Sequence, residues 1–236
     1  MPLTTVLFDL DGTLLPMDQK TFTKAYFGLL AQKLAPLGYK PDDLIAGIWT
    51  GIKAMVKNDG SRTNEEVFWQ TFSALFGDKV YDDIPLFDEF YRTDFQQVQV
   101  ACGFNPAAKE TVLRLKKKGL RLVLATNPIF PAVATESRLR WAGLDPDDFD
   151  MVTTYEDTHY CKPNPHYYSE ILERLRVSPD ECLMVGNDAT EDVAATALGM
   201  PVFLLPECLL NNDNVDITPY PQGSFDDLQT YIDTLL

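Results

Sequence analysis

Two acidic residues, Asp9 and Asp11, directly follow a short apolar run near the start of the chain. Carboxylates two positions apart repel one another unless a proton or a cation lies between them. Gly12 permits a tight turn after them, and such a turn leaves backbone N–H groups free to face an anion. Acids at the carboxyl end of a buried strand also lie where open α/β sheets bind ligands. This stretch therefore predicts a site that holds something positive.

Two later stretches offer groups suited to a phosphate. Thr126 and Asn127 end the apolar run 122–125, and their hydroxyl and amide can hydrogen-bond phosphoryl oxygens without adding charge. Lys162 stands just before a predicted helix at 165–176, where its ammonium group and the helix N-terminus both attract an anion. Taken singly, a strand-to-turn transition and a solvated lysine also explain these residues.

A second pair of acids, Asp188 and Asp192, follows the apolar run 182–185. Carboxylates four residues apart share one helix face and repel one another unless a cation or a lysine lies between them. Alone, this pair would also fit an ordinary acidic helix N-terminus. The four stretches are informative because each lies at a predicted strand end or just before a helix.

The elements that carry these residues alternate between strand and helix. Strands are predicted at 6–8, 122–125, 151–153, 182–185 and 202–205, and helices at 106–118, 131–142, 165–176, 190–198 and 225–235. This alternation indicates an α/β fold with a doubly wound, parallel, Rossmann-like sheet.

Residues 17–103 show helical periodicity and no convincing strand, which predicts a four-helix-bundle cap with an aromatic core. The segment interrupts the sheet just after its first strand and is expected to lie over the strand ends. We therefore predict an α/β core from residues 1–16 and 104–236 and a helical cap from 17–103.

Charge and cysteine content limit the partners. The net charge of −15 argues against a nucleic-acid backbone or a membrane surface as a partner. No signal peptide and no membrane-length apolar run is visible. The four cysteines are scattered, which is typical of reduced thiols in a cytoplasmic protein. The sequence does not indicate the oligomeric state.

In sequence, order and predicted context, these stretches resemble motifs one to four of the haloacid dehalogenase (HAD) superfamily: Asp9 with Asp11, Thr126, Lys162, and Asp188 with Asp192. The inserted helices resemble the C1 cap of subfamily I, which includes proteins like phosphoglycolate phosphatase and beta-phosphoglucomutase. The resemblance covers the whole predicted core.

The resemblance implies a Mg²⁺-dependent phosphatase that acts on a small phosphorylated metabolite. Asp9 would form an aspartyl-phosphate, and Asp11 would protonate the leaving group and then activate water. Mg²⁺ would be bound by Asp9, Asp188 and the backbone carbonyl of Asp11. Lys162 would bind phosphate and balance the acids, and Asp192 would orient Lys162 or metal-bound water.

Two alternatives stay open at this point. A phosphomutase uses the same residues but transfers the phosphoryl group to a sugar phosphate. A non-catalytic binding or regulatory protein could also use this scaffold. Substrate choice is expected in the cap, where Lys57, Asn58 and Arg62 lie in a polar connection that could reach the site. A plain exposed turn explains that connection at least as well.

Overall fold

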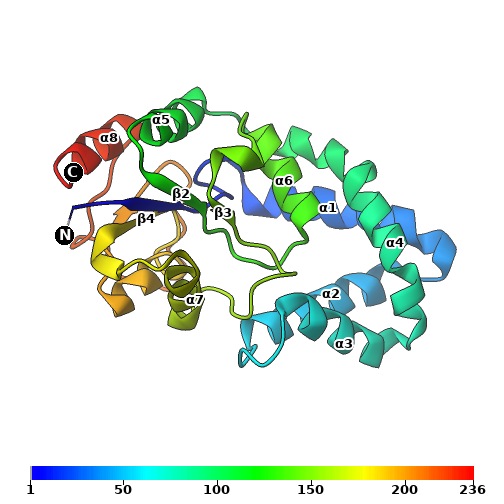
Figure 1. The fold of residues 1–236 in the computed structure, drawn as a ribbon. Helices are drawn as coiled ribbons and strands as arrows, with labels where there is room; N and C mark the ends of the chain where they lie inside the picture. The colour runs from blue at the N-terminus through cyan, green and yellow to red at the C-terminus, as the bar shows by residue number, and fades with distance from the viewer. Residues whose placement is uncertain (1) are drawn as a thin grey trace.

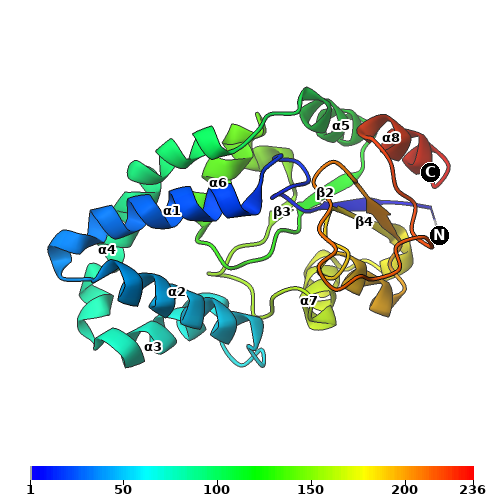
Figure 2. The same cartoon turned by 180° about the vertical axis from the view of Figure 1, so that it is seen from behind.

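A computed structural model describes residues 2–236, which fold around one parallel sheet in the strand order β3-β2-β1-β4-β5 (Figures 1 and 2). The strands are β1 (Thr5–Phe8), β2 (Arg121–Leu124), β3 (Met151–Val152), β4 (Cys182–Gly186) and β5 (Val202–Leu204). Each lies within one or two residues of its predicted range. The predicted doubly wound α/β sheet is confirmed.

Helices cover both faces of this sheet. They are α5 (Pro106–Lys117), α6 (Ala132–Trp141), α7 (Pro165–Leu175) and α8 (Phe225–Asp233), with 3₁₀-helices η3 (Pro146–Asp148), η4 (Pro179–Glu181) and η5 (Val193–Leu198). The predicted helix at 190–198 is present only as η5. The other predicted helices of the core are present.

Alternation of side chains along the central strands creates two apolar layers. Leu7 of β1 aligns with Val123 and Met184 of its neighbours, and these three pack with α7 and η5. Val6 and Phe8 point to the opposite face, in a cluster that includes residues of α5, α6 and α8. All four residues of β1 are buried. Period-two alternation on a strand buried on both faces explains the continuous apolar run.

The segment between β1 and α5 is helical. It contains α1 (Gln19–Leu34), η1 (Ala35–Leu37), α2 (Pro41–Val56), α3 (Asn64–Phe76), α4 (Lys79–Arg92) and the 3₁₀-helix η2 (Asp94–Ala101). Helix α3 begins at Asn64, because Thr63 is its N-cap and forms a reciprocal capping box with Glu66. Asn64 itself is fully buried.

The two linkers to this segment lie together, since Gly103 N donates to Pro16 O at 2.7 Å and Met17 bridges to Cys102. A single hydrophobic cluster extends from the sheet into the inserted helices. At their contact, the ring centroids of Phe95 and Trp141 are 5.1 Å apart. The division of the chain into domains at 16/17 and 103/104 therefore stays a prediction.

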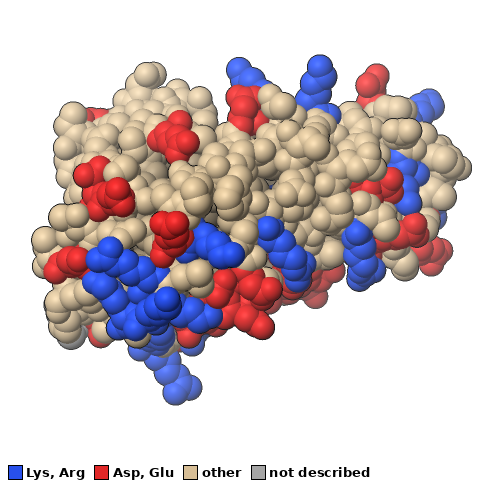
Figure 3. Space-filling model, turned by 90° about the horizontal axis from the view of Figure 1, so that it is seen from above, with Lys and Arg blue, Asp and Glu red and all other residues tan. Residues whose placement is uncertain are grey.

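The surface carries both signs of charge. Basic side chains gather among acidic ones on the face that bears α5 and α8 (Figure 3). Two lysines at the end of α5 are paired there: Lys116 lies 3.1 Å from Asp148, and Lys118 contacts Asp233. Because both lysines are already paired with acids, we interpret them as the charged end of a helix and not as a phosphate-binding patch. Within residues 2–236, no helix is both long and apolar enough to span a membrane.

Close packing of α2 on α3 depends on a glycine. A Cβ atom added at Gly51 would lie 2.5 Å from the buried ring of Phe68, whereas one added to Gly28 on α1 would meet no atom within 4 Å. We expect Gly51→Ala to lower the free energy of unfolding by about 1–3 kcal/mol, because the ring must move. The matched variant Gly28→Ala should raise it by about 0.5–1 kcal/mol through helix propensity. Urea unfolding measures both, and equal effects would contradict this account of the contact.

Candidate active site

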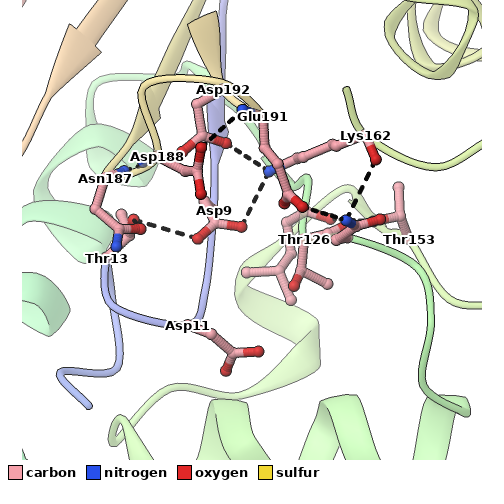
Figure 4. A network of polar contacts seen from close by, with 12 residues as sticks. Asp9, Asp11, Thr13, Thr126, Thr153, Lys162, Asn187, Asp188, Glu191 and Asp192 are labelled. Atoms are coloured by element: carbon pink, nitrogen blue, oxygen red, sulfur yellow. Dashed lines mark hydrogen bonds and ion pairs between the residues drawn. The ribbon is translucent and has the colours of Figure 1, made fainter. Parts of the chain in front are cut away.

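The carboxyl ends of the three central strands bring the predicted residues together (Figure 4). Asp9 follows β1, Thr126 lies just beyond β2, and Asp188 follows β4. The turn after Asp9 depends on Gly12, whose φ of +89° lies in the left-handed region that favours glycine. A side chain there would also collide with Asn187, because its Cβ would lie 2.3 Å from the Asn187 amide nitrogen.

Lys162 lies at the centre of this group. Its Nζ donates to Asp9 Oδ1 at 3.0 Å and to Asp192 Oδ1 at 2.7 Å, and its side chain is fully buried. Burial alone would lower the pKa of Lys162, but the nearby Asp192 and Asp9 carboxylates outweigh it and hold the pKa well above its usual range. Lys162 is therefore a fixed positive charge beside Asp9.

Asp192 also shapes the end of β4. Its Oδ2 accepts hydrogen bonds from the backbone N–H groups of Asn187 at 3.0 Å and Asp188 at 2.9 Å. Asp188 Oδ1 in turn accepts from the N–H groups of Thr190 and Glu191, both at 2.8 Å. These bonds fix the direction in which the Asp188 carboxylate enters the site.

The opening of the site is rich in acids whose charge is poorly balanced. Burial raises the pKa of Asp9 to about 7 even though Lys162 opposes the shift. Burial likewise raises the pKa of Asp188, and it raises that of Glu191 to about 8. A bound cation would stabilise the ionised forms of these carboxylates.

The donor set suits a magnesium ion that keeps several water ligands, rather than a metal ion enclosed entirely by protein ligands. Among residues 2–236, no three side chains of His, Cys, Asp or Glu converge as a complete metal site. Mg²⁺ usually takes only one or two carboxylates and fills its other positions with water and phosphate oxygens. Asp9 and Asp188, with the carbonyl of Asp11, match that requirement.

The residues after β2 are held by neighbours on the far side of the site. The carbonyl of Thr126 accepts hydrogen bonds from Tyr167 Oη at 2.8 Å and Thr153 Oγ1 at 2.9 Å. Asn127 Nδ2 donates to Glu191 Oε1 at 2.9 Å, and Asn127 Oδ1 is buried with no hydrogen-bond partner among the described residues. Both residues line the cavity at the strand ends, as a phosphate-binding role requires.

Asp11 is directed away from Asp9 (Figure 4). Its Oδ2 accepts a hydrogen bond from Nη1 of Arg138 on α6, a residue that sequence reasoning missed. The Arg138 side chain is fully buried, and its guanidinium lies 4.3 Å from the centre of the Phe130 ring. The other contacts of this guanidinium are long, at 3.4 Å to Ala134 O and 3.3 Å to Thr135 Oγ1. Asp11 is therefore the main counter-charge of a buried cation.

The connection between α2 and α3 lies elsewhere than expected. Lys57, Asn58 and Arg62 were candidates for contact with the substrate, but none of them lines the cavity beside Asp9. Lys57 and Arg62 are exposed, and Asn58 is buried with its Nδ2 bonded to Arg62 O and to Asn64 Oδ1, both at 2.9 Å. Asn58 therefore shapes the turn.

Asn64, which follows that turn, attaches the inserted helices to the core. Its backbone N–H donates to Thr158 O at 2.8 Å, and the next N–H, of Glu65, donates to Tyr155 O at 2.8 Å. The Asn64 side chain also donates to Tyr160 O at 3.3 Å. The start of α3 is thus bonded to the loop that precedes Lys162.

Together, the doubly wound sheet, the acids at its strand ends and the buried lysine define an α/β hydrolytic enzyme. A family model described as haloacid dehalogenase-like hydrolase matches residues 3–198, and the chain belongs to that family. The predicted family is therefore confirmed.

Relatives agree with this assignment. The chain is 29% identical over 199 residues to the pyrophosphatase PpaX of Bacillus cereus (strain G9842), covering 84% of this chain and 81% of that protein. A HAD phosphatase from Thermococcus onnurineus has a similar fold, with a TM-score of 0.60, 22% identity and 98% of both chains covered. The HAD-hydrolase YfnB of Bacillus subtilis, solved bound to magnesium, gives a TM-score of 0.59 and 22% identity over 99% of this chain and 100% of its own.

Arg138 is more deeply buried than Asp11, so loss of either partner should lower the free energy of unfolding by a different amount. We expect Asp11→Ala to lower the free energy of unfolding by about 3–5 kcal/mol, because it leaves a fully buried guanidinium without its carboxylate. Arg138→Met should cost less, since the Asp11 side chain is 22% exposed and is therefore less completely desolvated than the fully buried Arg138. The double variant should be about as stable as Arg138→Met alone.

Urea unfolding of the three variants tests this order. Active-site acids often repel one another, so removal of one of them can also stabilise a fold. An increase in stability for Asp11→Ala would show that repulsion dominates and that Arg138 does not depend on Asp11.

Proposed function

We propose that this protein is a Mg²⁺-dependent phosphatase that hydrolyses a small phosphomonoester through an aspartyl-phosphate on Asp9. The observation that carries this proposal is the placement of Asp9 at the end of the central strand, with Lys162 Nζ 3.0 Å away and no Lys, Arg or His among the described residues that line the cavity. A carboxylate so placed can attack phosphorus if its charge, and that of the phosphate, is balanced.

Asp9, Asp188 and the backbone carbonyl of Asp11 are the groups that would hold Mg²⁺. When bound, the ion supplies positive charge to the phosphoryl oxygens and lowers repulsion between the phosphate and the acids. The magnesium in the related YfnB structure supports this choice of metal.

The chain's own residues perform the two chemical steps. In the first, Asp9 attacks phosphorus, the bond to the leaving oxygen breaks, and Asp11 donates a proton to that oxygen. In the second, Asp11 takes a proton from the water that attacks the phosphoenzyme, and Asp9 is released with inorganic phosphate. Lys162, held in place by Asp192, balances charge throughout, and Thr126 and Asn127 hydrogen-bond the phosphoryl oxygens.

The contact with Arg138 suits the second of these steps. Arg138 Nη1 donates to Asp11 Oδ2 and holds this side chain at the edge of the cavity while Asp9 carries the phosphoryl group. In the first step, Asp11 must turn from Arg138 toward the leaving oxygen.

Hydrolysis agrees with the site better than the mutase alternative. A sugar phosphate that accepts the phosphoryl group carries a second phosphate of its own. No Lys, Arg or His side chain lines the described part of the cavity where that phosphate would lie. A purely binding role is less well supported, because a non-catalytic scaffold has no need of both Asp9 and Asp11.

Substitution of Asp9 and substitution of Asp11 are expected to block different steps of the reaction. With p-nitrophenyl phosphate, Asp9→Asn should abolish both turnover and the phosphoenzyme, because the nucleophile is lost. Asp11→Asn should still form the phosphoenzyme, since p-nitrophenolate leaves without a proton, but should hydrolyse it roughly 10²–10⁴-fold more slowly. Rapid-quench trapping with Mg²⁺ or with EDTA measures both steps.

Lys24→Ala, which changes an exposed lysine of α1 that does not line the cavity, serves as the control and should behave like the wild type. Turnover by Asp9→Asn, or full activity of the wild type in EDTA, would contradict the proposed mechanism.

A further inference from the structure

The cavity beside Asp9 has two chemically distinct walls. It has a volume of about 300 Å³ and lies between the strand ends and the inserted helices. The core wall is polar and supplies Asp9, Asp11, Thr126, Asn127, Asn187, Asp188 and Glu191. The phosphoryl chemistry proposed above uses this wall, so the leaving group must face the other one.

The opposite wall is made mostly of rings and aliphatic side chains. Helix α1 supplies Phe22, Tyr26 and Phe27, helix α2 supplies Trp49, Ile52 and Val56, and the loop after β2 supplies Ile129 and Phe130. Gln19 and Thr23 are the uncharged polar side chains of α1 that also line the cavity.

Part of this apolar wall is open to solvent. Trp49 is 43% exposed and Val56 is 39% exposed, although both lie on the inner side of α2. The Trp49 ring is held against Phe27, with 5.6 Å between the ring centroids and a T-shaped arrangement. Such a surface gains free energy when an apolar group covers it.

The described residues of this wall also include no positively charged side chain that could pair with a second anionic group of the substrate. No lysine, arginine or histidine is found among the described residues that line the cavity. The cations that contact Asp9 and Asp11 are fully buried and already paired, Lys162 with Asp9 and Asp192, and Arg138 with Asp11. An additional carboxylate or phosphate would thus be desolvated beside acids, without a partner.

We propose that the leaving group of the substrate is an uncharged, apolar alcohol, best matched by an aryl group, and that phosphoesters with a second anionic group are excluded. This inference rests on the proposed phosphatase function and specifies its substrate class. It separates this chain from its relative PpaX, because the substrate implied by the name pyrophosphatase has a second phosphate as its leaving group.

A pair of substrates of nearly equal shape tests the charge of the leaving group. We expect kcat/KM for phenyl phosphate to exceed that for 4-carboxyphenyl phosphate by about 100-fold. The intrinsic reactivity of the two esters runs the other way, because the carboxyphenolate is the better leaving group. Pyrophosphate should be as poor a substrate as the carboxylated ester.

Variants of α2 test whether this wall sets the preference. Val56→Arg adds a cation to the wall and should raise the ratio of 4-carboxyphenyl to phenyl activity by about fivefold. The matched control Thr50→Arg adds the same charge at an exposed position of α2 that does not line the cavity, and it should leave the ratio unchanged. Trp49→Ala should lower kcat/KM for phenyl phosphate roughly tenfold.

Acetyl phosphate separates failure of this inference from failure of the proposed function, because its leaving group is too small to need the apolar wall. Acetyl phosphate turnover together with equal or better use of 4-carboxyphenyl phosphate or pyrophosphate would overturn the inference alone. A preference for phosphocholine over phenyl phosphate would also overturn it, since the rings would then form a cation site. No Mg²⁺-dependent turnover of any of these phosphate compounds would overturn both.

Discussion

The buried ammonium group of Lys162, between the carboxylates of Asp9 and Asp192, is the interaction on which the site depends. A lysine cannot stay charged at this depth without close partners, and two buried acids cannot approach one another without a cation. The ends of β1 and β4 are therefore held together through one side chain. Gly186 makes this possible, because a Cβ there would lie 1.9 Å from Asp192 Oδ2.

The two walls of the cavity beside Asp9 offer a ligand different kinds of interaction. The core wall concentrates charge and hydrogen-bonding groups that are fixed by strands and by backbone N–H groups, so it can recognise a phosphoryl group whatever is attached to it. The helical wall offers shape and apolar area, which in the proposed function would distinguish one leaving group from another. Under that proposal, the chemistry and the selectivity come from different parts of the chain.

Most of the fold could be predicted from the sequence because parallel strands buried on both faces leave a strong pattern. Runs such as Val6–Phe8 end abruptly at polar residues, and those ends are where the site residues lie. The site residues at these ends were predictable for the same reason, whereas their roles stay predictions.

Long-range contacts could not be predicted in this way. Arg138 and Arg140 stand two residues apart on α6, yet Arg138 is buried against Asp11 while Arg140 pairs with the exposed Glu136. Only the packing of α6 against the inserted helices distinguishes them. Likewise, nothing local shows that Asn64 bonds to the loop before Lys162, and the polar residues Lys57, Asn58 and Arg62 were predicted to contact the substrate instead.

The central position of β1 has a consequence for how the chain folds. Thr5 pairs with Arg121 on one side and with Cys182 on the other, so the strand that carries Asp9 is made first and paired late. During synthesis, the helices between β1 and α5 emerge before either partner strand of β1 exists. Until β2 arrives, β1 is an apolar segment with both edges free, which is the kind of segment that aggregates or recruits chaperones. The order of elements that places the inserted helices beside Asp9 thus also leaves β1 unpaired until its partner strands have been made.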